Sequence, residues 1–284
     1  MREPVPRGAD RLVTVAFWAV AVLVVGLFAW LVGDVLRHGF SHVSLSLLTA
    51  EPEDAGRMGG IAPIIVSTLI IVAICMAVAV PLGLGTAILL SEFLPVSGRQ
   101  GRFVRRSLDV LASVPSVVFG LFGNAVFCQQ LGLGFSLLSG GLTLACMVLP
   151  FFTRTAEEGL RGVPREYREA AAALGLSQTG TLAHVLLPAA MPGLLAGFIL
   201  AVTRSLAETA ALIFTSGYVA RMPESLFESG RTLSVHIYDL AMNVSGGEGM
   251  AYASALVLMV LLIVLNWSAS WLSRRWSTQR GVAS

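Results

Sequence analysis

The sequence predicts an all-α membrane protein with six transmembrane helices. Of its 284 residues, 55% are hydrophobic and only 13% are charged, whereas ordinary globular domains carry about 25% charged residues. The mean hydropathy is +0.78, and the apolar residues gather in runs long enough to cross a bilayer. The net charge of +2 is too small to indicate nucleic-acid binding.

Six apolar runs are candidate transmembrane helices, because each holds about 18 residues or more. They cover residues 12–33, 61–90, 107–130, 137–153, 191–216 and 251–272. The first run follows MREPVPRGADR and is longer than the apolar region of a signal peptide, which has about 7–15 residues. We therefore expect an uncleaved helix, and we treat residues 1–284 as a single transmembrane domain.

The placement of arginine predicts the orientation of the chain in the membrane. All 19 basic residues are Arg, and fourteen of them lie in the N-terminal segment, at 99–106, at 154–168 and in the tail at 274–280. Positive residues are retained in the cytoplasm. Both termini and the two Arg-rich loops are therefore predicted to be cytoplasmic, in agreement with an even number of spans.

The cytoplasmic loop at about 154–190 is long, charged and rich in helix-forming residues. A first helix is predicted to run from Pro164 through REYREAAAAL and to stop at Gly175, because glycine commonly ends a helix. A second helix, SQTGTLAHVLL, is predicted to begin with Ser177 as its N-cap and to end before Pro188. By helix physics alone, a solvated amphipathic loop is the alternative interpretation.

The spacing within this loop resembles the EAA motif of permease subunits of binding-protein-dependent ABC importers. The motif positions, in order and with the family's spacing, are Glu169, Ala170, Ala171, Gly175, Val185, Leu187 and Pro188. Val185 stands where the family usually has Ile. The resemblance implies the type I ABC importer permease architecture, in which this loop forms a coupling helix that enters a cleft on the ATP-binding subunit. The small Ala pair would let such a helix lie close in a groove.

The fifth run contains two charged residues, Arg204 and Glu208, in the stretch TRSLAET. A charged residue at the centre of a membrane helix costs about 2.5–3.5 kcal/mol, so Arg204 is expected to face the bundle interior and to have a partner. A spacing of four places both residues on one helix face, where Glu208 could hold Arg204 or act as a gate. Arg offers planar, bidentate donors to an oxyanion, and a purely structural ion pair is the alternative.

This stretch also resembles the R-A-x-G-E-T segment of phosphate-specific importer permeases. Arg204, Glu208 and Thr209 are in register, whereas Ser205 and Ala207 replace the family's Ala and Gly. Segments similar to the A-type phosphate permease subunits lie at 59–69, 115–123, 155–175, 187–200 and 233–241. The resemblance implies a core permease module at about 59–272 and a substrate pathway that includes Arg204, Glu208 and Thr209.

The resemblance implies a permease subunit of an ATP-driven inorganic phosphate importer in the bacterial inner membrane. Its expected partners are a second, C-type permease subunit, two copies of an ATP-binding subunit, an extracytoplasmic phosphate-binding protein and membrane lipid. The chain has no G-x-x-x-x-G-K-[ST] loop, so ATP and Mg²⁺ are expected on the ATP-binding subunit and no cofactor on this chain. We expect no catalytic residues, and the three cysteines lack metal-ligand spacing.

A second class of function is an ion-coupled secondary transporter of an anion. It would explain the charged pair in the fifth run, but it leaves the EAA spacing without a purpose, and no inverted repeat is evident. An intramembrane enzyme is disfavoured, because the sequence contains neither H-E-x-x-H nor a G-x-S-x-G elbow.

Overall fold

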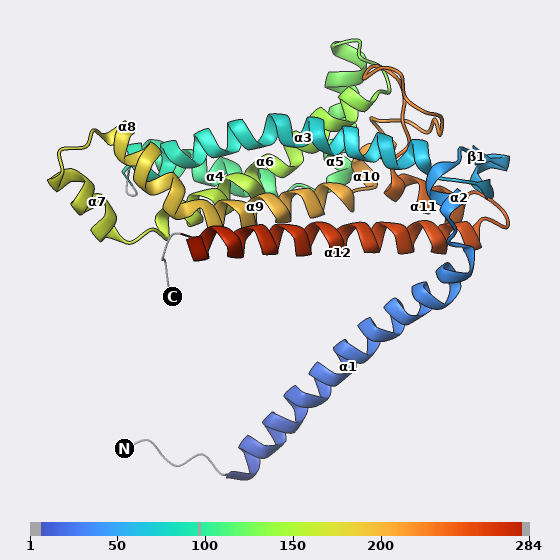
Figure 1. Cartoon of the computed structure of the whole chain (residues 1–284), viewed down its shortest axis with the longest axis horizontal. Coiled ribbons are helices and arrows are strands. Elements are labelled where there is room, and N and C mark those ends of the chain that lie inside the picture. Colours follow the sequence, from blue (N-terminus) through green and yellow to red (C-terminus); the bar gives the residue numbers. More distant parts are fainter. Residues whose placement is uncertain (1–6, 96–97, 280–284) are drawn as a thin grey trace.

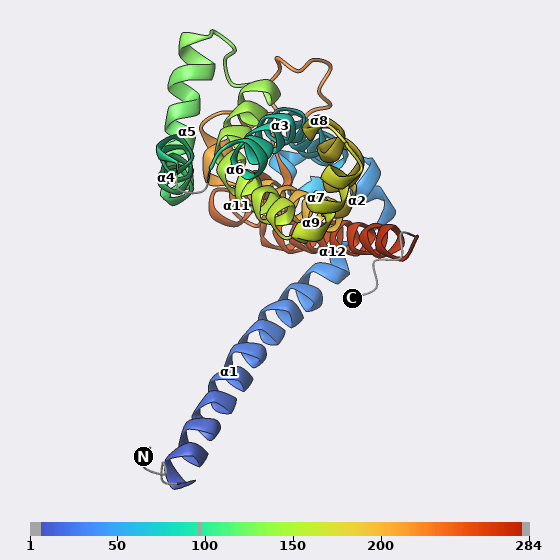
Figure 2. The same ribbon diagram turned by 90° about the vertical axis from the view of Figure 1, so that its left-hand side faces the viewer.

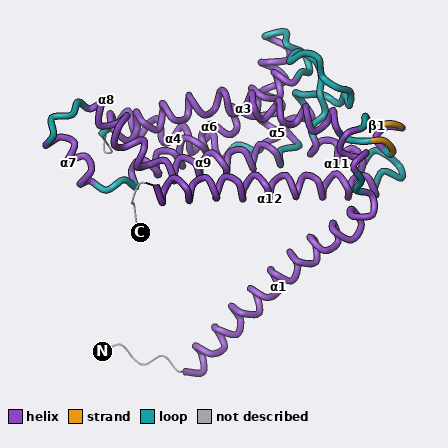
Figure 3. Tube along the Cα trace, viewed as in Figure 1, coloured by secondary structure: helices purple, strands orange, loops and turns teal. Residues whose placement is uncertain are grey.

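The computed structural model describes residues 7–95 and 98–279. Within them the chain is mostly helical, with long helices side by side and one short two-stranded hairpin at one end (Figures 1 and 3). The hairpin pairs β1 (Pro52–Glu53) with β2 (Met58–Gly59) in antiparallel register.

Five helices in the described part of the chain are long and apolar enough to cross a membrane. They are α1 (Arg7–Gly39), α3 (Ala62–Ile88) with the π-helical turn η3 (Leu89–Phe93), α6 (Leu137–Arg161), α9 (Leu187–Leu206) and α12 (Glu248–Gln279). The helix leading into α9 begins earlier, with α8 (Gln178–Thr181) and the π-helical turn η5 (Leu182–Leu186). These helices confirm five of the six predicted runs, and α6 extends well beyond the predicted end at residue 153.

The third predicted run, 107–130, is not a single straight span. It is divided between α4 (Arg99–Ser113) and α5 (Ser116–Gly123), and the latter continues as the π-helical turn η4 (Asn124–Gln130). The two parts meet at 98°, the geometry of a broken span or of a re-entrant loop. Val114 and Pro115 have extended ψ angles of 130° and 144°, because a residue before proline is pushed out of the helical region and proline lacks an N–H.

The two ends of the bundle carry different elements. The coupling end, as we call it, holds α7 (Arg165–Ala173) and α8, and the opposite end holds α2 (Leu45–Thr49), the hairpin and α11 (Leu233–Met242) (Figure 1). The Arg-rich segments at 99–106 and 154–168 both lie toward the coupling end, in agreement with the prediction that they share one side of the membrane. Arg2 and Arg280 lie outside the described residues, and the membrane orientation itself stays a prediction.

The bundle is centred on α3, α6 and α9, which approach closely through small residues. The backbones of α6 and α9 touch at Gly159 and Gly193, where a Cβ on Gly193 would lie 2.9 Å from the Gly159 Cα. Small residues allow this approach between membrane helices. By contrast, α1 diverges from the bundle (Figure 2), and its large side chains such as Trp18 are exposed, as they would be in lipid or against another chain.

The remaining short elements lie in the connections. They are η1 (Phe40–His42), η2 (Asp54–Gly56) and α10 (Ala210–Ile213). Of these, α10 matters for the site, because it restarts the helix just after α9 ends.

Candidate functional site: the coupling loop and the Arg204 segment

The predicted coupling helix is present as α7. Pro164 precedes its first residue, and Gly175 follows its end with φ +72°, a left-handed conformation that favours glycine. Ser177 caps α8, as predicted, through its Oγ, which accepts a hydrogen bond from the Gly180 N–H at 3.1 Å. The expected helix–glycine–helix unit is therefore confirmed.

The outer surface of α7 carries the residues expected to dock. Glu169 and Ala170 are exposed, whereas Ala171 is buried against the rest of the loop. Leu174, which follows α7, is 80% exposed.

The prediction that the second loop helix ends before Pro188 is wrong. The chain stays helical from α8 through η5 into α9, and Leu187 and Pro188 form the first turn of α9. Pro188 falls directly after the π-helical turn η5, where the regular α-helical hydrogen-bond ladder is already interrupted, so its missing N–H does not end the helix. The coupling loop is therefore continuous with the fifth span, and Leu187 and Pro188 are half-buried where the two join.

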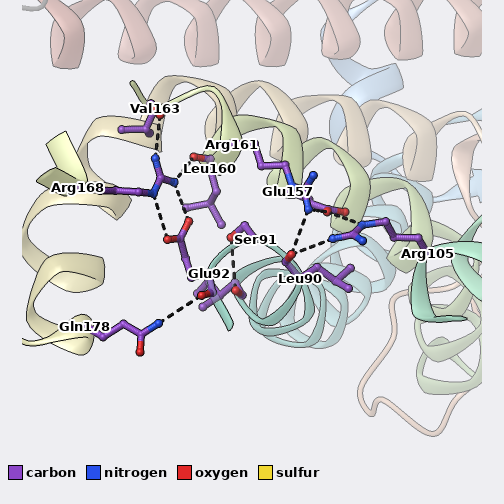
Figure 4. Close-up of polar contacts among 11 residues, drawn as sticks. Leu90, Ser91, Glu92, Arg105, Glu157, Leu160, Arg161, Val163, Arg168 and Gln178 are labelled. Carbon is purple, nitrogen blue, oxygen red and sulfur yellow. Dashed lines mark hydrogen bonds and ion pairs between the residues drawn. The ribbon is translucent and has the colours of Figure 1, made fainter. Parts of the chain in front are cut away.

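Arg168 ties α7 to the end of α3 (Figure 4). Its Nη2 and Nε donate to the two carboxylate oxygens of Glu92 at 2.7 and 3.2 Å. It also donates to the carbonyl oxygens of Leu160 and Val163 at 3.1 and 2.9 Å, where α6 ends. One guanidinium thus joins three segments with the bidentate geometry that makes Arg–carboxylate pairs strong.

A second ion-pair cluster lies beside the first. Glu157, whose side chain is 5% exposed, accepts from Arg105 of α4 at 2.8 Å and from Arg161 at 2.9 Å. Both arginines also donate to the Leu90 carbonyl oxygen, at 2.9 and 3.2 Å (Figure 4). Because Glu157 is paired twice, its burial carries no unpaired charge.

Glu92 and Glu157 are not among the residues predicted from the sequence. Both are acidic residues on the Arg-rich side of the chain, and Glu157 also has Arg161 at i+4. The partners Arg105 and Glu157 are 52 residues apart, and Arg168 and Glu92 are 76 apart, so no helical spacing joins either pair.

The structure changes the expected geometry around Arg204. Helix α9 ends at Leu206, so Glu208 lies beyond the helix rather than on the same face as Arg204. Within the described residues, 7–95 and 98–279, no ion pair joins Arg204 to Glu208. Ala207, at the helix end, has φ −84°, which any residue adopts, so the backbone conformation here does not require glycine.

Arg204 faces outward instead of into the interior of this chain's bundle. It is exposed, and its guanidinium carbon lies 5.7 Å from the centre of the Phe151 ring on α6, in cation–π range. Arg154, one helical turn from Phe151, is also partly exposed and pairs with Asp109 of α4. A charged face therefore runs over α6 between α9 and α4.

Glu208 and Thr209 form the break between α9 and α10. The Glu208 carboxylate accepts from the Ala211 N–H at 3.2 Å, and its carbonyl oxygen accepts from the Ser234 hydroxyl at 2.6 Å. The Thr209 carbonyl accepts from the Leu212 and Ile213 N–H groups at 3.2 and 3.1 Å. Unwound backbone of this kind is tolerated at membrane depth where protein or water surrounds it.

Comparison with known proteins supplies the family. Residues 79–278 match the family described as the binding-protein-dependent transport system inner membrane component. The Bacillus subtilis (strain 168) protein described as "Probable ABC transporter permease protein YqgI" is 31% identical over 93% of this chain and 94% of its own length. The Mycobacterium tuberculosis (strain CDC 1551 / Oshkosh) "Phosphate transport system permease protein PstA 1" is 32% identical over 92% and 87%.

The fold agrees with a solved transporter. A chain in the crystal structure of a bacterial ABC transporter involved in the import of the acidic polysaccharide alginate superposes with a TM-score of 0.67. The match covers 94% of this chain and 98% of that one, at 14% identity, which shows a shared fold.

The fold and the exposed coupling loop are those of a type I ABC importer permease. This chain belongs to the family of inner-membrane components of binding-protein-dependent transport systems. It is accordingly a multi-pass inner-membrane protein, and the relatives that it matches are described as permease proteins.

Proposed function

We propose that this chain is a permease subunit of an ATP-driven inorganic phosphate importer and forms half of its translocation pathway. One observation carries the proposal: a loop with the EAA spacing folds as an exposed helix ended by left-handed Gly175. The chain that holds this loop is 32% identical over 92% of its length to a phosphate transport permease. The importer would be completed by a C-type permease subunit, two ATP-binding subunits and an extracytoplasmic phosphate-binding protein.

The exposed position of Arg204 supports a second permease subunit. An arginine that faced lipid would cost several kcal/mol, about 2.5–3.5 on insertion scales. The face that carries Arg204 is therefore better placed against protein and water than against acyl chains. A second permease covering it would enclose Arg204, Glu208 and Thr209 in a pathway shared by the two chains.

Arg204 would bind the oxyanion as it passes. Glu208 would act by holding the break between α9 and α10, because its carboxylate caps α10. The guanidinium has no carboxylate partner among the described residues, so its planar donors are available to phosphate. Thr209 would add a hydroxyl beside the break. In this arrangement the chain itself holds no cofactor, and ATP and Mg²⁺ act on the ATP-binding subunits.

Docking of the ATP-binding subunit is tested by co-purification. Glu169→Lys reverses a charge on the outer face of α7, and Gly175→Asp places a side chain at φ +72°, where side chains are strained. Both variants should lose the ATP-binding subunit, whereas Glu51→Lys, exposed at the opposite end, should retain it. Retention in both loop variants would exclude this docking surface.

The phosphate pathway is tested by uptake of radioactive phosphate in cells that depend on this importer. Arg204→Gln should lower uptake at least about tenfold, because charge-assisted hydrogen bonds contribute roughly 1.5–3 kcal/mol, while assembly survives. Arg204→Lys should be intermediate, and Arg37→Gln on α1 should transport normally. Unchanged uptake in Arg204→Gln would favour a structural role.

The proposed orientation places both termini and the coupling end in the cytoplasm. The distribution of Arg supports it. Fluorescent protein fused to the C-terminus should fluoresce, and periplasmic alkaline phosphatase fused there should be inactive. The reverse result would show that the chain has the opposite orientation in the membrane. A secondary transporter is the other candidate, and uptake that persists without the ATP-binding subunits would favour it.

A further inference from the structure

One turn of the chain, η3 (Leu89–Phe93), collects contacts from four other helices. The Glu92 carboxylate binds Arg168 of α7, and the Glu92 carbonyl oxygen accepts from Gln178 of α8 at 3.3 Å. The Leu90 carbonyl oxygen accepts from Arg105 of α4 and Arg161 of α6. This turn is π-helical, and π turns inside helices are frequently found at functional sites.

We infer that η3 is the element that transmits movement of the coupling helix to the spans, with the Arg168–Glu92 pair as its clamp. The inference rests on the proposed function, since it assigns the transmission step of that same coupling loop. It names Glu92 and Arg168 as positioning residues, which touch neither phosphate nor ATP.

The two faces of α7 contact different partners. Arg168 and Ala171, three residues apart, share the inner face, while Glu169 and Ala170 point outward, where an ATP-binding subunit would dock. A force on the outer face reaches the rest of the chain through the inner one. There the guanidinium holds Glu92, 11% exposed, through two hydrogen bonds, so α7 cannot shift without moving η3 or breaking the pair.

From η3 the contacts continue to the charged face. Arg105 joins η3 to α4, and four residues farther along α4 Asp109 pairs with Arg154 of α6. Arg154 lies one turn from Phe151, whose ring contacts Arg204. The coupling loop and Arg204 are thus joined by a series of ion pairs, hydrogen bonds and helix segments that ends in the cation–π contact of Arg204 with Phe151. Such a series becomes a coupling route only if its members are energetically linked.

The test uses the complete complex in proteoliposomes, with phosphate-binding protein, and measures phosphate uptake and ATP hydrolysis together. Glu92→Gln keeps the size of the side chain and removes the charge that holds Arg168. The ratio of phosphate transported to ATP hydrolysed should fall about tenfold, within the range of measured couplings between sites. The ATP-binding subunits should still co-purify, because the outer face of α7 is unchanged.

Three further variants make the result specific. Arg168→Lys keeps the charge but cannot form the bidentate pair, so it should lower the ratio less than Arg168→Gln. The double variant Glu92→Gln/Arg168→Gln should lower it no further than Arg168→Gln alone, because that change already breaks the link to Glu92 as well as the hydrogen bonds to Leu160 and Val163. Glu158→Gln, an exposed glutamate on the same end of α6, should keep the wild-type ratio.

The outcomes separate this inference from the proposed function. If the wild-type complex neither transports phosphate nor couples it to ATP, the proposed function fails. If the wild-type complex is coupled and Glu92→Gln keeps its ratio, the clamp is refuted. The clamp is also refuted if additive effects appear in the double variant, or if Glu92→Gln loses the ATP-binding subunits, since the pair would then serve docking or folding alone.

Discussion

His236 makes the stability of the opposite end depend on pH. Its side chain is 0% exposed in α11, with Nδ1 3.4 Å from the Arg231 guanidinium, which in turn pairs with Asp239 at 3.1 Å. Its Nε2 has no hydrogen-bond partner among the described residues. Burial, and next the charge of Arg231, lower the pKa of His236 to about 4, and Asp239 offsets only part of this.

The sign and size follow from the difference between the two states. Unfolded histidine has a pKa of about 6.5, so below that pH His236 binds a proton in the unfolded chain but stays neutral in the folded one. The contribution of His236 to the free energy of unfolding is therefore fully present above pH 6.5 and is lost as the pH falls toward 4. Between pH 7 and 5 the loss is about 2 kcal/mol for a pKa lowered to about 4.

The assay is thermal unfolding of the detergent-purified protein at pH 7, 6 and 5, with His236→Gln beside the wild type. His236→Gln should be less stable at pH 7 but should lose the part of the pH slope that His236 supplies. An NMR titration of His236 with a midpoint near 6.5, or an unchanged slope in His236→Gln, would refute the reasoning.

Two further predictions concern packing inside the bundle. Gly193→Val should destabilise the protein in detergent by about 1–3 kcal/mol, because its Cβ would press on the α6 backbone, while Gly85→Val, with open space around it, should not. Thr68→Val should cost about 1–3 kcal/mol, since the buried Leu233 N–H loses its acceptor at 2.9 Å; Thr86→Val is the control, because the half-buried Thr86 hydroxyl bonds only to the Leu82 carbonyl oxygen of the same helix. Equal melting temperatures within either pair would contradict the corresponding contact.

The coupling loop was predictable because its signals are local. Pro164, Gly175 and Ser177 each act through their own backbone geometry or through an N–H three residues away. The break near Pro115 has an equally local cause. It was missed because the third span was predicted from hydropathy, which carries no information on the direction in which the chain runs. The apolar run therefore concealed a 98° bend.

The arrangement of Arg204 and Glu208 was beyond local reasoning for a different reason. A spacing of four places two residues on one face only while the helix lasts, and α9 stops at Leu206. The Glu208 carboxylate then caps α10, and its carbonyl oxygen receives the Ser234 hydroxyl from a residue 26 positions away. The tertiary contact decides which partner each charge has.

Dependence on tertiary contacts also explains why the residues between the EAA motif and the Arg204 segment form no recognisable sequence motif. The i,i+4 pair of Glu157 and Arg161 follows a local rule, but Glu157 is neutralised a second time by Arg105, 52 residues away. Such a carboxylate is costly to leave unpaired in the interior, so its role depends on where α4 lies rather than on its neighbours in sequence. A substitution at Glu92 or Glu157 would leave the EAA spacing and Arg204 intact. Under the proposed clamp, such a substitution would nonetheless break the contacts that connect the coupling loop with the Arg204 face.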